Sequence, residues 1–332
     1  MGDLNLQSSL FGDEVVRSTG LGRDRLAAQL YSILECLSLD GLVACITTPL
    51  IETIEYSLLL SGKKACQKTS LLFNPHRLDT VSGKSKMSIF AAMKTPSFCD
   101  GLARAMLFDS KRKLDIRETL YTTLRLGING VQYCDEFQPY ILRDLCLRYH
   151  LGKTSSILDP CGGWGGRMIG ASATVDHYCC FEPSTRTSAG LSKLAAWLEV
   201  LSPGFSASVY QTPFEDSCLS DGAFDMAITS PPYYDTEKYN DEPQDSANRF
   251  HTFQDWADGF FAPLVHKTMS ALKPRRPFIL NIGSRIYPLS ETLKVICVDR
   301  YQMRATSAVS LSGKSGLGKS GEGETFYEIT GT

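Results

Sequence analysis

A glycine-rich turn between a short apolar run and a helical stretch constrains the fold of this chain more than any other feature. The apolar run 156–158 leads into residues 159–167, which read Asp-Pro-Cys-Gly-Gly-Trp-Gly-Gly-Arg. Four glycines in the five positions 162–166 let the backbone turn sharply and approach a ligand closely. Such a turn after a strand and before a helix predicts an α/β unit whose ligand lies at the end of the strand.

Beyond residue 111 the sequence alternates between short apolar runs and longer stretches with helical spacing. This alternation predicts a parallel sheet with helices on both faces. We therefore expect a Rossmann-like α/β domain over 111–332, preceded by a mostly helical region over 1–110. The expected helices are 23–39, a pair within 41–60 that bends at Pro49, 117–126, 139–149, 187–201 and 253–272. The expected strands are 156–158, 178–181, 207–210, 224–229, 277–282, 293–298 and 326–329.

Acidic residues follow the second and third expected strands. Glu182 ends the second strand 23 residues after Asp159, the usual distance for an acid that accepts hydrogen bonds from a ribose hydroxyl pair. After the third strand, Glu215 could accept from the amino group of an adenine, with Phe214 on the adenine ring. Taken alone, Glu215 and Asp216 fit an ordinary surface pair better. Together with the glycine-rich turn, these residues predict a site for a nucleoside-containing cofactor.

The fourth expected strand ends in Ser230-Pro231-Pro232-Tyr233. A Pro-Pro pair donates no backbone hydrogen bonds, so it lies beyond the strand, where it stiffens the loop. The Ser230 side chain and the neighbouring carbonyl then form a pair of small polar acceptors beside the flat ring of Tyr233. This arrangement predicts a pocket for a planar heterocycle that carries an exocyclic amine.

The glycine-rich run 159–166 and the run 230–233 resemble motifs I and IV of the S-adenosylmethionine-dependent amino-methyltransferases, which methylate adenine N6 or cytosine N4 in DNA. The resemblance covers about residues 115–332, and the first run precedes the second by 71 residues, as in the γ-like members of the family. It implies a seven-stranded class I methyltransferase sheet, S-adenosyl-L-methionine as the cofactor and DNA as the substrate. The cofactor-binding residues that it implies are Phe137, Asp159, Pro160, Cys161, Gly162, Gly163, Trp164, Gly165, Glu182, Phe214 and Glu215.

The resemblance also implies that Ser230, Pro231, Pro232 and Tyr233 are the catalytic residues. Ser230 and the Pro231 carbonyl would accept the two N–H bonds of the target amine and stabilise the positive charge that develops on its nitrogen. Tyr233 would stack on the base, which has to be flipped out of a duplex or presented in single-stranded DNA. Ser230 slightly favours cytosine N4, because Asp or Asn is commoner at this position in the adenine enzymes.

Other interpretations remain open. The same chemistry can act on RNA, and the similar protein-glutamine methyltransferases normally have Asn at the Ser230 position. A further alternative is a catalytically silent subunit with the same fold. The intact Asp159 and Glu182 argue against this alternative. Residues 60–125 hold thirteen basic and five acidic residues in a protein of net charge −2, so this segment is either a DNA-binding surface or a solvated face.

The remaining features exclude several classes of protein. The sequence starts without the basic and apolar pattern of a signal peptide, so we expect a cytoplasmic protein whose eleven cysteines are reduced. The apolar stretch 41–62 is interrupted by Pro49, Glu52 and Glu55, so no membrane span is expected. Cysteines and histidines show no metal-ligand spacing, so no metal is expected either. The sequence does not indicate an oligomeric state.

Overall fold

The structure is a computed structural model of the 332-residue chain. The residues that it describes are 23–82, 85, 87–110, 116–131, 133–235, 237–238, 242–283, 286–298, 300–306 and 324–331. The chain divides into two compact units. The first comprises Met1–Glu52 and Pro75–Asp135, and the second comprises Thr53–Asn74 and Glu136–Thr332.

The first unit is mostly helical, as the sequence predicts for this region. Helix α3 buries Leu26, Leu30 and Leu34, which recur every four residues along one face, and it packs along α7. The expected break at Pro49 is confirmed, because this proline begins a new helix, the position in which its missing N–H costs least. The elements of this unit are α3 (Arg23–Glu35), α4 (Leu39–Ile46), the start of α5 (Pro49–Leu60), η2 (Pro75–Asp79), β1 (Val81–Ser82), α6 (Ile89–Met93), α7 (Pro96–Ser110) and α8 (Ile116–Leu126).

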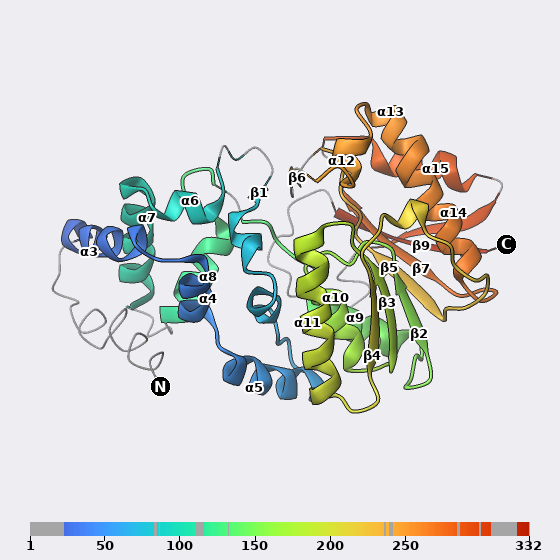
Figure 1. The fold of residues 1–332 in the computed structure, drawn as a ribbon, viewed down its shortest axis with the longest axis horizontal. Coiled ribbons are helices and arrows are strands. Elements are labelled where there is room, and N and C mark those ends of the chain that lie inside the picture. The colour runs from blue at the N-terminus through green and yellow to red at the C-terminus, as the bar shows by residue number, and fades with distance from the viewer. Residues whose placement is uncertain are drawn as a thin grey trace. The chain divides into compact units, whose positions relative to one another are not determined.

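The second unit is built on a seven-stranded sheet (Figure 1). In sheet order its strands are β4 (Ser206–Tyr210), β3 (His177–Phe181), β2 (Ser156–Asp159), β5 (Met226–Thr229), β7 (Phe278–Gly283), β9 (Glu324–Gly331) and β8 (Tyr301–Thr306). The first five of these pair in parallel, and β9 runs antiparallel to both of its neighbours. The predicted seven-stranded Rossmann-like sheet is confirmed.

The strand order reverses between β2 and β5. From β2 the chain proceeds outward through β3 to β4, and it then returns to add β5 and β7 on the other side. In open α/β sheets the ligand lies beyond the carboxyl ends of the strands at this reversal. The two segments that leave the sheet there begin with Pro160 after β2 and with Ser230 after β5.

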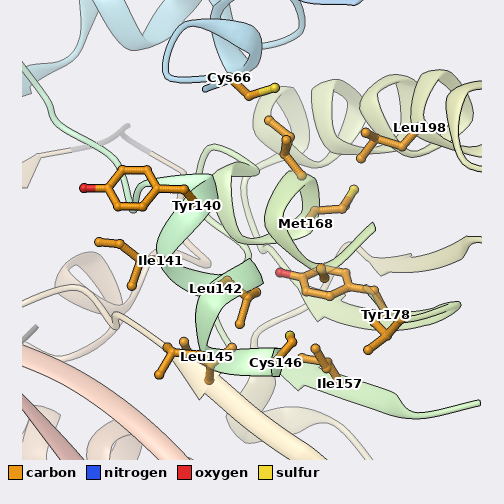
Figure 2. Packing of buried hydrophobic residues seen from close by; sticks show 14 of the residues in the cluster. Cys66, Tyr140, Ile141, Leu142, Leu145, Cys146, Ile157, Met168, Tyr178 and Leu198 are labelled. Atoms are coloured by element: carbon orange, nitrogen blue, oxygen red, sulfur yellow. The ribbon is translucent and has the colours of Figure 1, made fainter. Parts of the chain in front are cut away.

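Helices of the second unit cover both faces of the sheet. The helical elements of this unit are the remainder of α5, η1 (Thr69–Leu72), α9 (Pro139–Arg148), α10 (Gly166–Ser172), α11 (Thr185–Leu201), η3 (Phe214–Asp216), α12 (Ser246–Arg249), α13 (Phe253–Trp256), the π-helical η4 (Ala257–Phe261), α14 (Ala262–Ala271) and α15 (Leu289–Cys297). The two-residue strand β6 (Glu237–Lys238) lies outside the seven-stranded sheet. Consecutive strand residues point to opposite faces. Ile157 therefore joins the core under α9, α10 and α11, part of which Figure 2 shows, and Leu158 joins the core under η4, α14 and α15.

One expected strand is wrong. The apolar run 293–298 lies mostly within helix α15, in which Leu289, Leu293 and Cys297 recur at helical spacing and are buried. The seventh strand is instead β8, which the sequence analysis missed. β8 is an edge strand whose residues are mostly half-buried or exposed, so it lacks the continuous apolar run of a central strand. The other six expected strands are confirmed within two residues at each end.

Some predictions fall outside the described residues. The basic segment is described only in part, because Lys84, Lys86 and 111–113 lie outside the described ranges. No single helix in the described ranges is long and apolar enough to cross a membrane. Helices α4 and α5 reach that length and apolarity only together, as a pair bent by 47°.

Candidate active site

The turn after β2 requires glycine at the positions where the sequence has it. Gly165 adopts a positive φ of 100° and caps α10, and a Cβ on it would lie under 3.0 Å from Leu194. A Cβ on Gly166 would lie under 3.0 Å from the backbone oxygen of Phe137. The Gly162 N–H donates to the Phe181 oxygen at 2.7 Å, which holds the turn against the end of β3. The turn is therefore a tightly packed backbone segment at the point where the strand order reverses.

The Asp159 carboxylate makes its hydrogen bonds within this turn and with the elements that flank it. Its carboxylate is fully buried, and Oδ2 accepts from Arg167 Nε at 2.6 Å and from the Tyr178 hydroxyl at 2.5 Å. Oδ1 accepts from Thr229 Oγ1 at 2.9 Å and from the Cys161 N–H at 3.3 Å. Because both oxygens already accept two hydrogen bonds each, Asp159 fixes the turn, α10 and the end of β5 relative to one another.

Arg167 extends this network. Its guanidinium, which is almost fully buried, pairs with Asp159 and donates to the Cys161 carbonyl oxygen, and its centre lies 5.6 Å from the ring centroid of Phe137. Burial raises the pKa of the Cys161 thiol, which therefore stays protonated near neutral pH. Phe137 is half-buried and contacts Phe326 edge to face at 6.0 Å. Phe137 lies beside the turn and Cys161 lies within it. Both were expected from the sequence to contact a cofactor.

Glu182 lies at the carboxyl end of β3, beside the turn. One of its carboxylate oxygens accepts from the Ser184 N–H at 3.0 Å, and the Gly163 N–H also donates to the carboxylate. Burial raises the pKa of Glu182 to about 8, so its carboxyl is mostly protonated at pH 7. Hydrogen bonds donated by the hydroxyls of a ligand would stabilise the carboxylate form, lower this pKa and release the proton to solvent.

Glu215 lies after β4, and its side chain is 4% exposed. Oε1 accepts from Arg249 Nη1 at 2.7 Å, whereas Oε2 is buried with no hydrogen-bond partner among the described residues. Burial also raises the pKa of this carboxyl. Phe214 is 2% exposed and packs edge to face on Phe181 at 5.0 Å, so in this structure its ring belongs to the core.

Trp164 is held by a residue distant in the sequence. Its side chain is buried, and its backbone oxygen accepts from Asn74 Nδ2 at 3.1 Å. Asn74 is itself fully buried, and a Cβ on Gly190 would lie under 3.0 Å from Asn74 Oδ1. The segment Thr53–Asn74 thereby supports the glycine-rich turn of the same unit.

The segment after β5 presents two polar side chains. Ser230 Oγ lies 3.3 Å from the Tyr233 hydroxyl, and both side chains are half-buried. The next residue, Tyr234, adopts a positive φ of 59°, which is uncommon for a residue with a side chain. Its ring packs edge to face on Tyr287 at 5.1 Å and on Phe253 at 6.1 Å. This packing anchors the loop, so that consecutive tyrosines differ in role: Tyr234 joins the core and Tyr233 stays at the site.

Three functional positions were missed by the sequence analysis. Thr229 connects the two segments, because its hydroxyl donates to Asp159 and accepts from the Cys161 N–H at 3.1 Å. Asn281 on β7 places its amide beside Ser230, with Nδ2 at 3.5 Å from Oγ. Arg249 of α12 pairs with Glu215. Only Asn281 carried a signal, as the single polar residue in the apolar run 278–282.

The described residues contain no group of three or more His, Cys, Asp and Glu side chains that could hold a metal ion. The groups that the described residues place around this site are carboxylates, hydroxyls, an amide and aromatic rings. These groups suit a ligand with hydroxyl and amine donors next to a planar ring.

No protein-family model matches the sequence, and no curated protein does. Among solved structures, the chain is similar to an rRNA methylase from Streptococcus thermophilus, with 10% identity and a TM-score of 0.37 over 58% of this chain and 93% of that chain. It is also similar to a putative methyltransferase from Streptococcus mutans in complex with SAH, with 10% identity and a TM-score of 0.40 over 59% and 99%. A tRNA (m1A58) methyltransferase from Aquifex aeolicus shows 13% identity and a TM-score of 0.39 over 65% and 85%. At these values the likeness adds nothing to what the strand order itself shows.

Proposed function

We propose that this protein transfers a methyl group from S-adenosyl-L-methionine to the exocyclic amine of a base in DNA. The observation that carries the proposal is the meeting of two sets of residues at one point of the sheet. The glycine-rich turn, Glu182 and Glu215 follow three neighbouring strands, and Ser230 follows the strand on the other side of the reversal. A nucleoside cofactor and an amine-bearing ring would therefore lie next to each other.

The residues present fit this cofactor. The unpartnered Oε2 of Glu215 is a buried acceptor, and the amino group of an adenine would supply the missing donor. Glu182 would accept from the two ribose hydroxyls, and the turn 160–165 would lie along the remainder of the molecule. Phe137 and Trp164 are the aromatic neighbours for its cationic sulfonium. Bound there, the cofactor supplies the electrophilic methyl group.

The chain's own contribution to transfer is to position and polarise the amine. The lone pair of an amine on an aromatic base is delocalised into the ring, which makes the nitrogen a weak nucleophile. Hydrogen bonds from the amine to Ser230 Oγ and to the Pro231 carbonyl favour a more tetrahedral nitrogen and stabilise its developing charge. Stacking on Tyr233 holds the base in line with the methyl group, and such positioning supplies much of the rate.

DNA is the proposed substrate because the residues 230–233 resemble those of the DNA amino-methyltransferases. Ser230 favours cytosine N4 over adenine N6. The base would reach the site by flipping out of a duplex or from a single strand. The same acceptors would serve a base in RNA, so methylation of RNA is the alternative that the experiments below distinguish.

We also propose a division of labour along the chain. Region 1–110 and the basic segment 60–125 would hold DNA, and 111–332 would carry out transfer in the cytoplasm. Reversing the charge of Lys111, Arg112 and Lys113 should weaken binding to DNA and flatten its dependence on salt. An unchanged salt slope would remove this cluster from the interface.

The test of the proposed function is the transfer of labelled methyl to unmethylated duplex DNA. The double variant Ser230→Ala, Tyr233→Ala should abolish transfer and leave the affinity for S-adenosylhomocysteine within a few-fold of the wild-type value. That affinity is the control for folding. Transfer by the double variant at the wild-type rate would refute the assignment of the pocket, and a wild-type protein that binds the ligand but methylates nothing would be a silent scaffold.

A further inference from the structure

Ser230 presents a chemical problem that an acid or an amide at its position would not. A hydroxyl has one hydrogen and two lone pairs, so it can donate one hydrogen bond while it accepts others. To polarise a target amine it has to accept, and its own hydrogen has to be directed elsewhere. A carboxylate or amide oxygen has no hydrogen and needs no such arrangement. The site must therefore contain groups that orient the Ser230 hydroxyl.

Three contacts connect Ser230, Tyr233 and Asn281. The Tyr233 hydroxyl donates to the backbone oxygen of Asn281 at 3.4 Å. Ser230 Oγ lies 3.3 Å from the same hydroxyl, and Asn281 Nδ2 donates to Ser230 Oγ at 3.5 Å. Asn281 is 6% exposed and lies in the central strand β7, where an amide is costly unless it is used.

One arrangement of the hydrogens satisfies all three contacts. A carbonyl oxygen only accepts, so the single hydrogen of Tyr233 points to Asn281. At the contact between the two hydroxyls, Tyr233 must then be the acceptor and Ser230 the donor. The amide of Asn281 occupies one lone pair of Ser230 Oγ. In this arrangement one lone pair of Ser230 Oγ remains for a further donor.

Resting on the function proposed above, we propose that Asn281 and the Tyr233 hydroxyl form a relay that makes Ser230 a fixed acceptor for the target amine. Asn281 is a positioning residue in this scheme, and Tyr233 combines stacking with orientation of Ser230. The contacts of 3.3–3.5 Å are long for hydrogen bonds between side chains, and catalytic hydrogen bonds often shorten only when the substrate is bound. The relay should therefore act on kcat more than on binding of the cofactor.

The experiment compares Tyr233→Phe in two backgrounds. The variant keeps the ring that stacks on the base and removes the hydroxyl. With Ser230 present, we expect kcat to fall about tenfold, which corresponds to about 1.4 kcal/mol, with KM for the cofactor unchanged. With Ser230→Asn, whose oxygen has no hydrogen to direct, Tyr233→Phe should change kcat less than about twofold. Tyr234→Phe is the matched control for the loss of a tyrosine hydroxyl from the same loop.

Asn281→Leu should behave as Tyr233→Phe does in both backgrounds. If Ser230→Asn is too slow to measure, Ser230→Ala replaces it, and adding Tyr233→Phe should then cost nothing further. If Tyr233→Phe lowered kcat by the same factor in every background, the relay would be refuted. The Tyr233 hydroxyl would then act independently of Ser230. A wild-type protein that methylates no DNA would instead refute the proposed function and, with it, the role of the relay.

Discussion

The proposed placement of the ribose at Glu182 predicts that binding of the cofactor depends on pH. Burial raises the pKa of its carboxyl from 4.5 to about 8. Below that pH the group is mostly protonated, and one of its oxygens carries a hydrogen. The two ribose hydroxyls that we place there are donors, so the ligand favours the ionised form. Binding should therefore release a proton, and affinity should fall as the pH falls below 8.

The size of the effect follows from the ionised fraction. With a pKa of about 8, about one carboxyl in eleven is ionised at pH 7 and about nine in ten at pH 9. Affinity should rise about ninefold from pH 6 to pH 7 and about tenfold from pH 7 to pH 9. At pH 7, binding should release about 0.9 protons through this group.

The assay is calorimetric titration with S-adenosylhomocysteine in buffers of different ionisation enthalpy. The ligand's own amino group also titrates in alkaline solution, so the matched control is Glu182→Gln, whose amide does not titrate. The difference between the two profiles isolates the carboxyl. Identical pH profiles for the wild type and Glu182→Gln would refute the placement of the ribose at Glu182.

Three further substitutions test the frame around the site. Arg143 is almost fully buried and donates to three backbone oxygens at the end of α5. The substitution Arg143→Met should therefore lower the free energy of unfolding by about 3 kcal/mol in a urea titration. A loss of less than about 1 kcal/mol would contradict this role. Gly166→Ala should cost about 2 kcal/mol and weaken binding of the cofactor, because its methyl group would overlap a backbone oxygen, whereas Gly152→Ala, with nothing within 4 Å, should do neither. Thr229→Val removes a donor to a buried carboxylate, so it should lower the unfolding free energy by about 1–2 kcal/mol, and an unchanged thermal midpoint would show that the hydroxyl is not needed.

The sheet could be predicted because its information is local. A strand, a glycine-rich turn and an acid at a fixed distance all lie within the stretch from Ser156 to Glu182. The error at 293–298 has a physical cause too, because a short apolar run fits a strand as well as one face of a helix. Strand β8 was missed because an edge strand is buried less than a central one, so its sequence is less apolar.

The site could be predicted only in part, because its remaining members come from distant segments. Thr229 and Asp159 are 70 positions apart, and Asn281 lies a further 51 positions beyond Ser230. Asn74 reaches the turn from a segment that precedes the sheet altogether. The spacing of residues along the sequence does not reveal contacts between such distant segments. A lone asparagine in an apolar strand is a usable signal, because a buried amide requires partners.

The central claim is that an exocyclic amine of a DNA base receives the methyl group. The most direct measurement incubates the protein with labelled S-adenosylmethionine and duplex DNA, single-stranded DNA or bulk RNA, and then identifies the methylated nucleosides by mass spectrometry. The proposed function predicts N4-methylcytosine or N6-methyladenine from DNA, and neither product from the Ser230→Ala, Tyr233→Ala variant. Label found only in RNA or only in protein, with unmodified DNA, would contradict the claim.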